Sequence, residues 1–486
     1  MKVSRRSFLK TSALALPAVT VGCRSSMSAI ERTPPTRPSA LSRVNLAVIG
    51  CGTQGFANMN GFLQDPRVRV TTVCDPVLSA GRYSYRSEKT CGRAPAKMRV
   101  DEFYKNEDCR MVADFREVLA DPSVDAVLIA TPDHWHAIQS VMAMKAGKHV
   151  YCQKPMSLGI SEGKEMARVA KETDVTFQVG SQQRSSSEFR VAAELVASGY
   201  IGECMSCEIG LPGGNKGMYG HANSICRELW RAPDYFTPEE MWDMWQGPAQ
   251  HWEDNSFIQG IHDPMCWRFN SRTGGGMITD WGAHHLDILQ WTLGMDGSGP
   301  VAIENMVHDR DPNDRIFDWA VNYSFDVVYA NGFRAHVTNK LPNGLKFHGK
   351  KGDIFVARGK LDRPEFLKKW NEKKDLKGRD VHLYRPRGGV SHEMDFIDAV
   401  FSGGRTACPC SVGHRSITIA HVANICERLG LSSLKWDPAA ERFPDNADAN
   451  RLAVVPHYTG WTICCLERRE SCGARGWRLA RCAHVP

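Results

Sequence analysis

The chain has 486 residues, of which 42% are hydrophobic and 24% charged, an ordinary globular composition that is long enough for two or three domains. The formal net charge is +7, but no basic stripe with interleaved aromatic residues is present, which argues against a nucleic-acid partner. Most of the 17 cysteines are scattered in apolar runs, and neither Cys204-x-x-Cys207 nor Cys408-Pro-Cys410 has a second ligand pair at zinc spacing, so no metal is expected.

The first residues predict export. Arg5 and Arg6 precede Phe-Leu-Lys and a moderately apolar run, a pattern that resembles a twin-arginine signal over residues 1–30. The run is too short to span a bilayer as a mature helix. It ends at Cys23, where "TVGC" resembles a lipoprotein cleavage box with Thr20 in place of the usual leucine, so lipidation at Cys23 remains open. Residues 31–43 are a Pro-rich linker. The expected location is periplasmic, with a membrane tether as an alternative.

Residues 44–180 predict a doubly wound Rossmann domain. Val44 to Ile49 form a near-continuous apolar strand, followed by Gly50-Cys51-Gly52-Thr53-Gln54-Gly55 and a helical stretch. Between a strand and a helix, this G-x-G-x-x-G allows a tight turn and brings backbone N–H groups to a pyrophosphate at the helix N-terminus. The motif therefore predicts a dinucleotide site.

The second strand supplies a candidate ribose ligand. "RVRVTTVC" ends at Asp75, twenty residues after Gly55, where a carboxylate accepts hydrogen bonds from a ribose 2′-OH and repels a 2′-phosphate. This favours NAD, although Arg82 leaves NADP as an alternative. Residues 81–106 are basic and polar, and we expect them to form a loop or a lid over the adenosine.

Two further strands, at 124–131 and 148–152, enclose a helix at about 135–146 that stops at Gly147. The carboxyl ends of parallel strands share one edge of the sheet, so Thr131, Pro132 and Lys154 are expected beside the nicotinamide. His134 and His136 either pack against the helix or line the cleft. The predicted cofactor-binding residues are Gly50, Gly52, Thr53, Gln54, Gly55, Asp75, Thr131, Pro132, His136, Gln153 and Lys154.

From residue 181 to 452 the pattern changes. A helix at 188–198, a turn at Gly199 and a strand from about Glu203 precede strand-like runs at 301–307, 320–329, 333–338 and 353–357. This predicts a second α/β domain with an open, largely antiparallel sheet.

The segment 273–294, "TGGGMITDWGAHHLDILQWTLG", predicts a helix from about Thr279. Asp280 and His284 are four residues apart and share one face. A carboxylate that orients an imidazole suits proton transfer, because the imidazole pKa lies near neutral pH. A buried capping pair is the alternative. His285 points about 100° away from His284, and we interpret His285 and Asp287 as structural.

The glycine motif, Lys154-Pro155 after a strand, and Gly-Gly-Gly-x-x-x-Asp-x-x-x-His together resemble the Gfo/Idh/MocA oxidoreductases. The resemblance runs from about Val44 to Leu452, and it includes "MWDMWQGP" (241–248), "HEMDFIDAV" (392–400) and "GHRS" (413–416). The family's Glu-Lys-Pro falls on Gln153, Lys154 and Pro155, so the glutamate is replaced by an uncharged glutamine.

The resemblance implies that Lys154 binds the substrate hydroxyl near the nicotinamide, that His284 is the acid/base, and that Asp280 is its partner or a substrate ligand. It implies an NAD(P)-dependent oxidoreductase acting on a hydroxyl of a sugar, sugar derivative or cyclitol, and a homo-oligomer formed through the C-terminal sheet. The twin-arginine pattern adds the expectation of a tightly held cofactor, because no nicotinamide pool is expected outside the cytoplasm. A redox-neutral NAD-dependent glycosidase or lyase is the main alternative, and a non-catalytic sensor is another. Residues 461–486 have no hydrophobic period, and residues 453–486 are predicted to be a disordered tail.

Overall fold

A computed structural model describes residues 43–80, 90–213, 244–249, 267–313, 317–371, 391–457 and Trp461. All of them belong to one compact unit, residues 37–486. The signal segment with Cys23, the linker up to residue 42 and Arg82 lie outside the described residues. Within these ranges no helix is both long and apolar enough to cross a membrane.

The N-terminal part is the predicted Rossmann sheet. Six parallel strands run in the order β3-β2-β1-β4-β5-β6, which places the change of direction between β1 and β4, where doubly wound folds bind nucleotides. The strands are β1 (Val44–Ile49), β2 (Val68–Cys74), β3 (Arg110–Val112), β4 (Ala126–Ile129), β5 (His149–Cys152) and β6 (Phe177–Val179). Their near-continuous apolar runs follow from burial on both faces.

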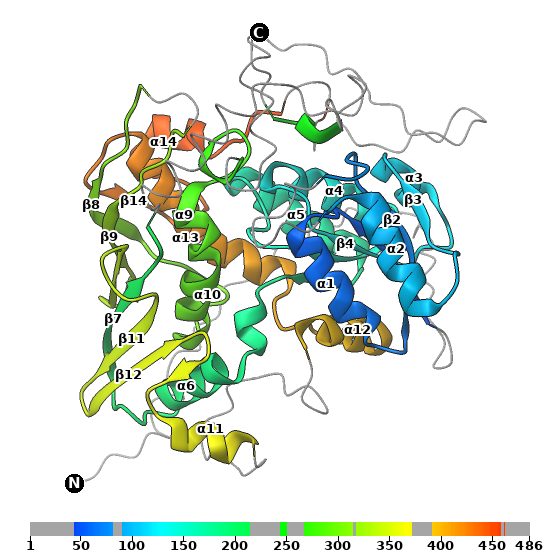
Figure 1. Ribbon diagram of the computed structural model, residues 1–486. Coiled ribbons are helices and arrows are strands. Elements are labelled where there is room, and N and C mark those ends of the chain that lie inside the picture. The colour runs from blue at the N-terminus through cyan, green and yellow to red at the C-terminus, as the bar shows by residue number, and fades with distance from the viewer. Residues whose placement is uncertain are drawn as a thin grey trace, which may run out of the picture. The chain divides into compact units, whose positions relative to one another are not determined.

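Helices cover both faces of this sheet (Figure 1). Leu46 and Val48 belong to one apolar cluster with α1 (Thr53–Leu63) and α2 (Arg93–Tyr104), whereas Ala47 and Ile49 belong to another with α3 (Phe115–Ala120), α4 (Asp133–Lys145) and α5 (Ile160–Thr173). Residues 93–104 are therefore a helix where the sequence suggested a loop or a lid. The sequence shows no helical hydrophobic pattern there, because only Ala96 and Val100 of α2 are buried.

The second sheet has eight strands in the order β13-β12-β11-β7-β10-β9-β8-β14. Only its β7–β10 pair is parallel, so the predicted largely antiparallel sheet is confirmed. The strands are β7 (Cys204–Gly210), β8 (Ala302–His308), β9 (Tyr323–Val328), β10 (Arg334–Thr338), β11 (Gly344–Gly349), β12 (Gly352–Ala357), β13 (Lys360–Leu361) and β14 (Leu434–Lys435). Strands β11, β13 and β14 were not predicted from the sequence.

The strands of this second sheet alternate buried and solvent-facing residues, as expected when one face is packed. The buried face packs against α6 (Ser187–Ala197), α10 (Gly282–Thr292) and α13 (Cys410–Arg428). The other face carries polar contacts, such as the ion pair of Arg334 with Glu304 at 2.8 Å and the contact of His336 Nδ1 with Asp326 Oδ1 at 2.7 Å. Contact between copies of the chain through this face remains a prediction. The short α11 (Pro364–Asn371) packs against α6.

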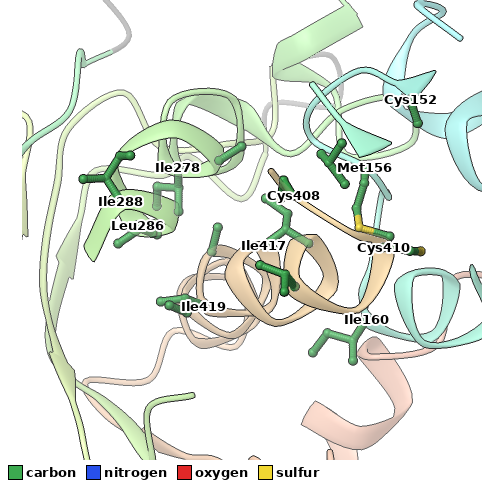
Figure 2. Packing of buried hydrophobic residues seen from close by; sticks show 14 of the residues in the cluster. Cys152, Met156, Ile160, Ile278, Leu286, Ile288, Cys408, Cys410, Ile417 and Ile419 are labelled. Carbon is green, nitrogen blue, oxygen red and sulfur yellow. The ribbon is translucent and has the colours of Figure 1, made fainter. Parts of the chain in front are cut away.

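One apolar core joins the two sheets. Figure 2 shows Cys152, the last residue of β5, and Met156, which follows that strand, close to Cys410 and Ile417 of α13, with Leu286 and Ile288 of α10 on the other side. Helix α13 contacts α5 and β6 of the Rossmann part as well as α10 and β8 of the second part. The division of the chain near residue 181 is thus a change of sheet within a continuous core.

The C-terminal segment returns to the Rossmann part. In α12 (His392–Ser402), Phe396 packs edge-on against Phe62 and Tyr151, at centroid distances of 6.2 and 5.8 Å. After α14 (Ala447–Leu452), Val455 N–H donates to the Ser161 hydroxyl at 3.0 Å.

The predicted start of the tail at residue 453 requires correction. Trp461 is 5% exposed and packs against Phe115 and Trp135. A single aromatic anchor has no hydrophobic period, which is why the pattern did not reveal it. Residues 462–486 lie outside the described residues.

Candidate active site

A cavity of about 440 Å³ lies at the carboxyl ends of β1, β4 and β5. It gathers residues that are distant in the sequence: the glycine loop, the residues after β4 and β5, and side chains of η3 (Trp267–Phe269), α9 (Gly276–Asp280) and α10. Of the predicted site residues, those lining it are Gly52, Thr53, Gln54, Thr131, Pro132, His136, Gln153, Lys154, Asp280 and His284.

The glycine loop forms a turn that other residues cannot adopt. Gly50 has φ +93°, and a Cβ there would lie 2.6 Å from the carbonyl carbon of Ala130. A Cβ on Gly55 would lie 1.9 Å from the Gly50 oxygen. Gly52 caps the N-terminus of α1, whose backbone N–H groups therefore face the cavity edge. This turn fits a pyrophosphate group.

Asp75 lies beside this loop and lines a small adjoining cavity together with Gly50, Thr131 and Pro132. Its carboxylate accepts hydrogen bonds from Cys51 N–H at 2.7 Å and from Val77 N–H at 2.8 Å. These bonds orient the carboxylate at the end of β2. Each carboxylate oxygen can accept more than one hydrogen bond, so the predicted contact with a ribose hydroxyl stays a prediction.

His136 braces the loop that carries Lys154. Its Nδ1 lies 2.7 Å from the Pro155 carbonyl oxygen, and its Nε2 lies 2.8 Å from the Thr131 carbonyl oxygen. Burial lowers the pKa of His136 to about 4, so the ring is neutral and donates to only one of these two oxygens. His136 thus positions the Lys-Pro turn against the end of β4. Its neighbour His134 instead contacts the Trp245 carbonyl, at 3.1 Å.

Lys154 and Asp280 form the central ion pair of the cavity. Lys154 Nζ donates to Asp280 Oδ1 at 2.7 Å and to the Asp280 carbonyl at 3.1 Å, and Arg268 Nε lies 3.6 Å from the same Oδ1. Burial alone would raise the pKa of Asp280, but the positive charges of Lys154 and Arg268 lower it to about 2. Asp280 is therefore ionised at neutral pH.

His284 lies next to this pair but does not share its carboxylate. From the sequence we expect Asp280 to orient His284, but among the described residues Asp280 binds Lys154 and Arg268. The intervening residue Trp281 separates α9 from α10. Burial lowers the pKa of His284 well below its usual range, and the charges of Lys154 and Arg358 lower it further. Nδ1 of His284 is enclosed and has no hydrogen-bond partner among the described residues, which leaves Nε2 to face the cavity.

Gln153, at the position of the family's glutamate, is the start of a buried amide chain. Its Nε2 donates to Asn58 Oδ1 at 2.7 Å, and Asn58 Nδ2 donates to Glu393 Oε1 at 2.7 Å. Its Oε1 accepts from the backbone N–H of Lys154 at 3.2 Å. The hydrogen-bond chain therefore begins at the Gln153 amide and ends at a carboxylate, that of Glu393 in α12.

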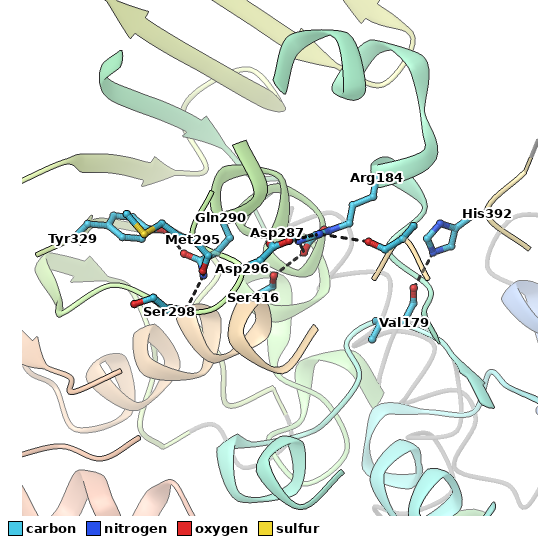
Figure 3. A network of polar contacts seen from close by, with 11 residues as sticks. Val179, Arg184, Asp287, Gln290, Met295, Asp296, Ser298, Tyr329, His392 and Ser416 are labelled. Carbon is cyan, nitrogen blue, oxygen red and sulfur yellow. Dashed lines mark hydrogen bonds and ion pairs between the residues drawn. The ribbon is translucent and has the colours of Figure 1, made fainter. Parts of the chain in front are cut away.

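His285 and Asp287 have structural partners, as interpreted from the sequence. His285 Nε2 lies 2.6 Å from Asn343 Oδ1. Asp287 receives two hydrogen bonds of 2.7 Å from the Arg184 guanidinium and one of 2.6 Å from the Ser416 hydroxyl. Figure 3 shows this network, in which Asp296 also binds Arg184 and His392 binds the Val179 carbonyl. It ties α10 and α13 to the turn after β6.

Three ionisable residues of the cavity were not predicted from the sequence. Asp133 is the first residue of α4 and is 4% exposed; burial, followed by the negative charge of Asp280, raises its pKa to about 8. Its place directly after Thr131-Pro132 was the available signal. Arg268 and Arg358 also line the cavity, and they come from segments without a motif. Trp245, Trp267 and Trp281 add aromatic walls.

Two family models match the chain. Residues 44–181 match the NAD-binding Rossmann fold of the Gfo/Idh/MocA oxidoreductase family, and residues 190–463 match the C-terminal α/β domain of the same family. The predicted NAD cofactor is thereby confirmed, while the preference over NADP remains a prediction.

Similar proteins include a 1,5-anhydro-D-fructose reductase of Ensifer adhaerens, 25% identical over 52% of this chain and 63% of the relative. A levoglucosan dehydrogenase of Pseudarthrobacter phenanthrenivorans is 25% identical over 56% of each chain. These matches span less than two thirds of either relative. Among solved structures, the WlbA dehydrogenase of Bordetella pertussis in complex with NADH and UDP-GlcNAcA has a TM-score of 0.57 at 16% identity, covering 82% of this chain and 99% of that chain.

Proposed function

Because this chain belongs to the Gfo/Idh/MocA oxidoreductase family and carries its NAD-binding Rossmann fold, we propose that it oxidises a hydroxyl-bearing carbon of a sugar, sugar derivative or cyclitol, or reduces the corresponding carbonyl. The observation that carries the proposal is the 2.7 Å pair between Lys154 Nζ and Asp280 Oδ1, which lies in the same cavity as the glycine loop and His284. Relatives named as a sugar reductase and a sugar dehydrogenase support the substrate class.

The residues present fit the cofactor. The turn at Gly50 and Gly55 leaves no room for side chains, and the N-terminus of α1 and Asp75 would hold the pyrophosphate and the ribose. When bound, NAD supplies the acceptor for the hydride of the substrate's C–H bond. Thr131, Pro132 and Gln153, which line the same cavity, would hold the nicotinamide end.

The chain itself positions the hydroxyl and moves its proton. Lys154 carries three N–H donors, of which Asp280 occupies some, and a remaining donor binds the substrate oxygen and holds it for reaction. His284 Nε2 faces the cavity and accepts the hydroxyl proton while the electron pair of the C–H bond leaves with the hydride. The positive charge of Lys154 stabilises the oxygen as this proton leaves.

Replacement of the two proposed catalytic groups tests this scheme. We expect Lys154→Met and His284→Ala each to lower turnover at least about 10²-fold, the scale of acid–base groups, while NAD still binds in a calorimetric titration. Activity is followed as NADH formed from a panel of sugars, anhydrosugars and inositols. Lys164→Met, at a lysine with a 57% exposed side chain on α5, is the matched control and should behave as the wild type.

Near-normal turnover in either variant would contradict the proposed roles. The same assay, run with aryl glycosides, distinguishes the alternative: release of the aglycone without net NADH formation would support a redox-neutral glycosidase or lyase instead.

The twin-arginine pattern at Arg5 and Arg6 supports a further part of the proposal, which is export of a protein that already holds its cofactor. Outside the cytoplasm no nicotinamide pool is expected to replace a lost cofactor, so retention for hours needs tight binding, and a nanomolar Kd corresponds to about −12 kcal/mol.

The retention proposal is tested by purifying the mature protein without added nucleotide and dialysing it extensively. We expect close to one equivalent of bound nucleotide by mass spectrometry after denaturation. Loss of nearly all nucleotide, with activity wholly dependent on added NAD, would reject tight retention.

A further inference from the structure

Asp133 is a carboxyl group of the cavity that the proposed reaction does not use. It is the first residue of α4 and directly follows Pro132. Asp133 is 4% exposed and lines the cavity, and no donor among the described residues forms a hydrogen bond with its carboxyl group. A buried polar group without a hydrogen-bond partner is unfavourable until water or a ligand supplies one.

Two polar side chains near Asp133 in the sequence already have partners of their own. The Thr131 hydroxyl donates to Gln139 Oε1 at 2.8 Å. Both ring nitrogens of His136 lie within 2.8 Å of backbone carbonyl oxygens. These contacts hold Thr131 and His136 in place, which leaves the Asp133 carboxyl group for a ligand in the cavity.

The charged residues that act on Asp133 locate it at the reacting end of the cavity. Burial is the main cause that raises its pKa, and the negative charge of Asp280 raises it further, whereas the positive charges of Arg268 and Lys154 lower it. Glu162 of α5 has a smaller effect. Because the reacting hydroxyl is proposed to bind at the pair of Lys154 and Asp280, Asp133 lies beside the substrate.

Asp133 carries a proton at neutral pH, because its pKa is about 8. The two histidines of the same helical turn, His134 and His136, are uncharged, since burial lowers their pKa values to about 4. Although the N-terminus of α4 favours a negative charge in its first turn, burial keeps the pKa of the Asp133 carboxyl group well above its ordinary value. A protonated carboxyl group combines one O–H donor with a carbonyl acceptor, whereas a carboxylate only accepts hydrogen bonds.

This combination of donor and acceptor matches a hydroxyl group. A hydroxyl group also donates one hydrogen bond and accepts others, so a protonated carboxyl group satisfies both of its functions. An ammonium group, as in an amino sugar, has donors only and needs a carboxylate when it is buried. Lys154 and His284 bind the reacting hydroxyl in the proposed scheme, which leaves Asp133 for a different hydroxyl of the same molecule.

We propose that Asp133 is a further substrate-binding residue, whose carboxyl group exchanges hydrogen bonds with a second hydroxyl group of the substrate while Lys154 and His284 hold the first. The substrate is therefore a polyol with at least two free hydroxyl groups. Asp133 selects against analogues in which the second hydroxyl is absent or replaced by an amine. This inference rests on the proposed function, because it names a group that the same site recognises.

Two variants separate the chemistry of Asp133 from its volume. Asp133→Asn keeps a donor and an acceptor in nearly the same shape, and Asp133→Ala removes both. Binding of D-glucose, D-galactose, 1,5-anhydro-D-glucitol and myo-inositol to the NAD-loaded enzyme is followed by tryptophan fluorescence, and kcat/KM is measured for the same compounds. We expect Asp133→Ala to lower the affinity and kcat/KM for the preferred compound at least about tenfold, the scale of a lost hydrogen bond to a buried group, and Asp133→Asn to retain most of both at pH 7.

Monodeoxy analogues of the preferred compound then identify the hydroxyl group that Asp133 binds. For the wild type, we expect one analogue that still carries the reacting hydroxyl to bind at least about tenfold more weakly than the parent compound. In Asp133→Ala this loss of affinity should disappear, while the losses for the other analogues persist. A purely structural role of Asp133 would change the affinity for all analogues alike.

Asp448→Ala, at an aspartate with a 61% exposed side chain in α14, is the matched control and should behave as the wild type. Melting temperatures and the affinity for NAD verify that the Asp133 variants fold. The inference is overturned if Asp133→Ala binds and uses the compounds as the wild type does, or if Asp133→Asn loses as much as Asp133→Ala. It is also overturned if the losses for the deoxy analogues are the same in Asp133→Ala and the wild type, or if none of the compounds binds.

The inference and the proposed function can fail separately. Wild-type behaviour of Asp133→Ala, together with loss of turnover in Lys154→Met and His284→Ala, would overturn the inference but keep the proposed function. The expected pattern of analogue binding without oxidation of any compound would keep the inference and reject the proposed function.

Discussion

At the scale of single residues, the two carboxyl groups of the candidate active-site cavity differ in their protonation state. Asp280 and Asp133 lie in the same cavity, but their pKa values, about 2 and about 8, are far apart. The difference arises because Asp280 contacts Lys154 at 2.7 Å, whereas Asp133 receives no hydrogen bond from another described residue and is disfavoured as an anion by burial and by Asp280. Asp133 therefore holds a proton at neutral pH, and Asp280 does not.

The proton on the Asp133 carboxyl group makes the free energy of unfolding depend on pH. The ordinary pKa of an aspartate in the unfolded chain is 3.8, and in the folded protein the pKa of Asp133 is raised to about 8. Because the folded state binds the proton more tightly, the contribution of Asp133 is most favourable below pH 4 and is lost as the pH rises to about 8. We expect Asp133→Asn to be more stable than the wild type at pH 8, by an amount on the order of a few kcal/mol, with a much smaller difference at pH 5.

Thermal denaturation at both pH values measures this effect. Asp448→Asn, at an aspartate with a 61% exposed side chain in α14, is the control and should leave the pH dependence unchanged. An Asp133→Asn variant whose gain is the same at pH 5 and pH 8 would show that Asp133 is ionised in the folded protein.

At the scale of elements, several strands and helices could be predicted because the burial of their residues leaves a hydrophobic pattern in the local sequence. The run Val44 to Ile49 and the helix at 187–197 were found in this way. Helix α2, strand β11 and the docking of Trp461 were not. Helix α2 buries only two residues, and β11 begins at a glycine with φ +150°. A single tryptophan produces no period, so only its contacts reveal that the chain is still packed at residue 461.

Trp461 is expected to anchor the C-terminal segment. It is buried against Phe115, Trp135 and the Arg116 guanidinium. We expect Trp461→Ala to lower the free energy of unfolding by about 3 kcal/mol, the usual scale for a buried aromatic. Deletion of residues 464–486, which show no apolar face in the sequence, should leave the melting temperature unchanged. If the deletion destabilises the protein as much as Trp461→Ala does, the residues beyond 463 contribute to the fold.

At the scale of the whole molecule, the Rossmann part is not independent of the rest. Helix α12 lies more than 330 positions after α1 in the sequence. It contributes Phe396, Ile397 and Val400 to the apolar core on one face of the Rossmann sheet. Helix α13 packs against α5 and β6. We therefore expect that the sequence boundaries 44–180 and 181–452 separate two sheets but not two independent folding units.

An isolated fragment tests this view. We expect residues 44–180 alone to bind a hydrophobic dye and to unfold without a cooperative transition, because Phe62 and Tyr151 lose the aromatic cover of Phe396. The intact chain should unfold in a single transition by calorimetry and by circular dichroism. A soluble fragment that unfolds cooperatively and binds NAD would show that the Rossmann part is autonomous.

By itself the sequence determined the features that depend on neighbouring residues. These are the glycine turn from Gly50 to Gly55, the parallel strands that bring Asp75, Thr131 and Lys154 to one edge, and a second, mostly antiparallel sheet. They are predictable because burial on one or both faces of a strand and the backbone needs of a tight turn leave a local pattern. The family resemblance rests on the same motifs.

Tertiary structure alone decided which groups meet. Asp280 pairs with Lys154, 126 positions away, and not with His284 on the next turn of its own segment. Arg268 and Arg358 enter the cavity from separate elements, and Glu393 reaches the Gln153 chain from α12. The residues next to a charged side chain in the sequence do not indicate its ion-pair partner, because ion pairs follow from the packing of whole helices and strands and not from spacing along the chain.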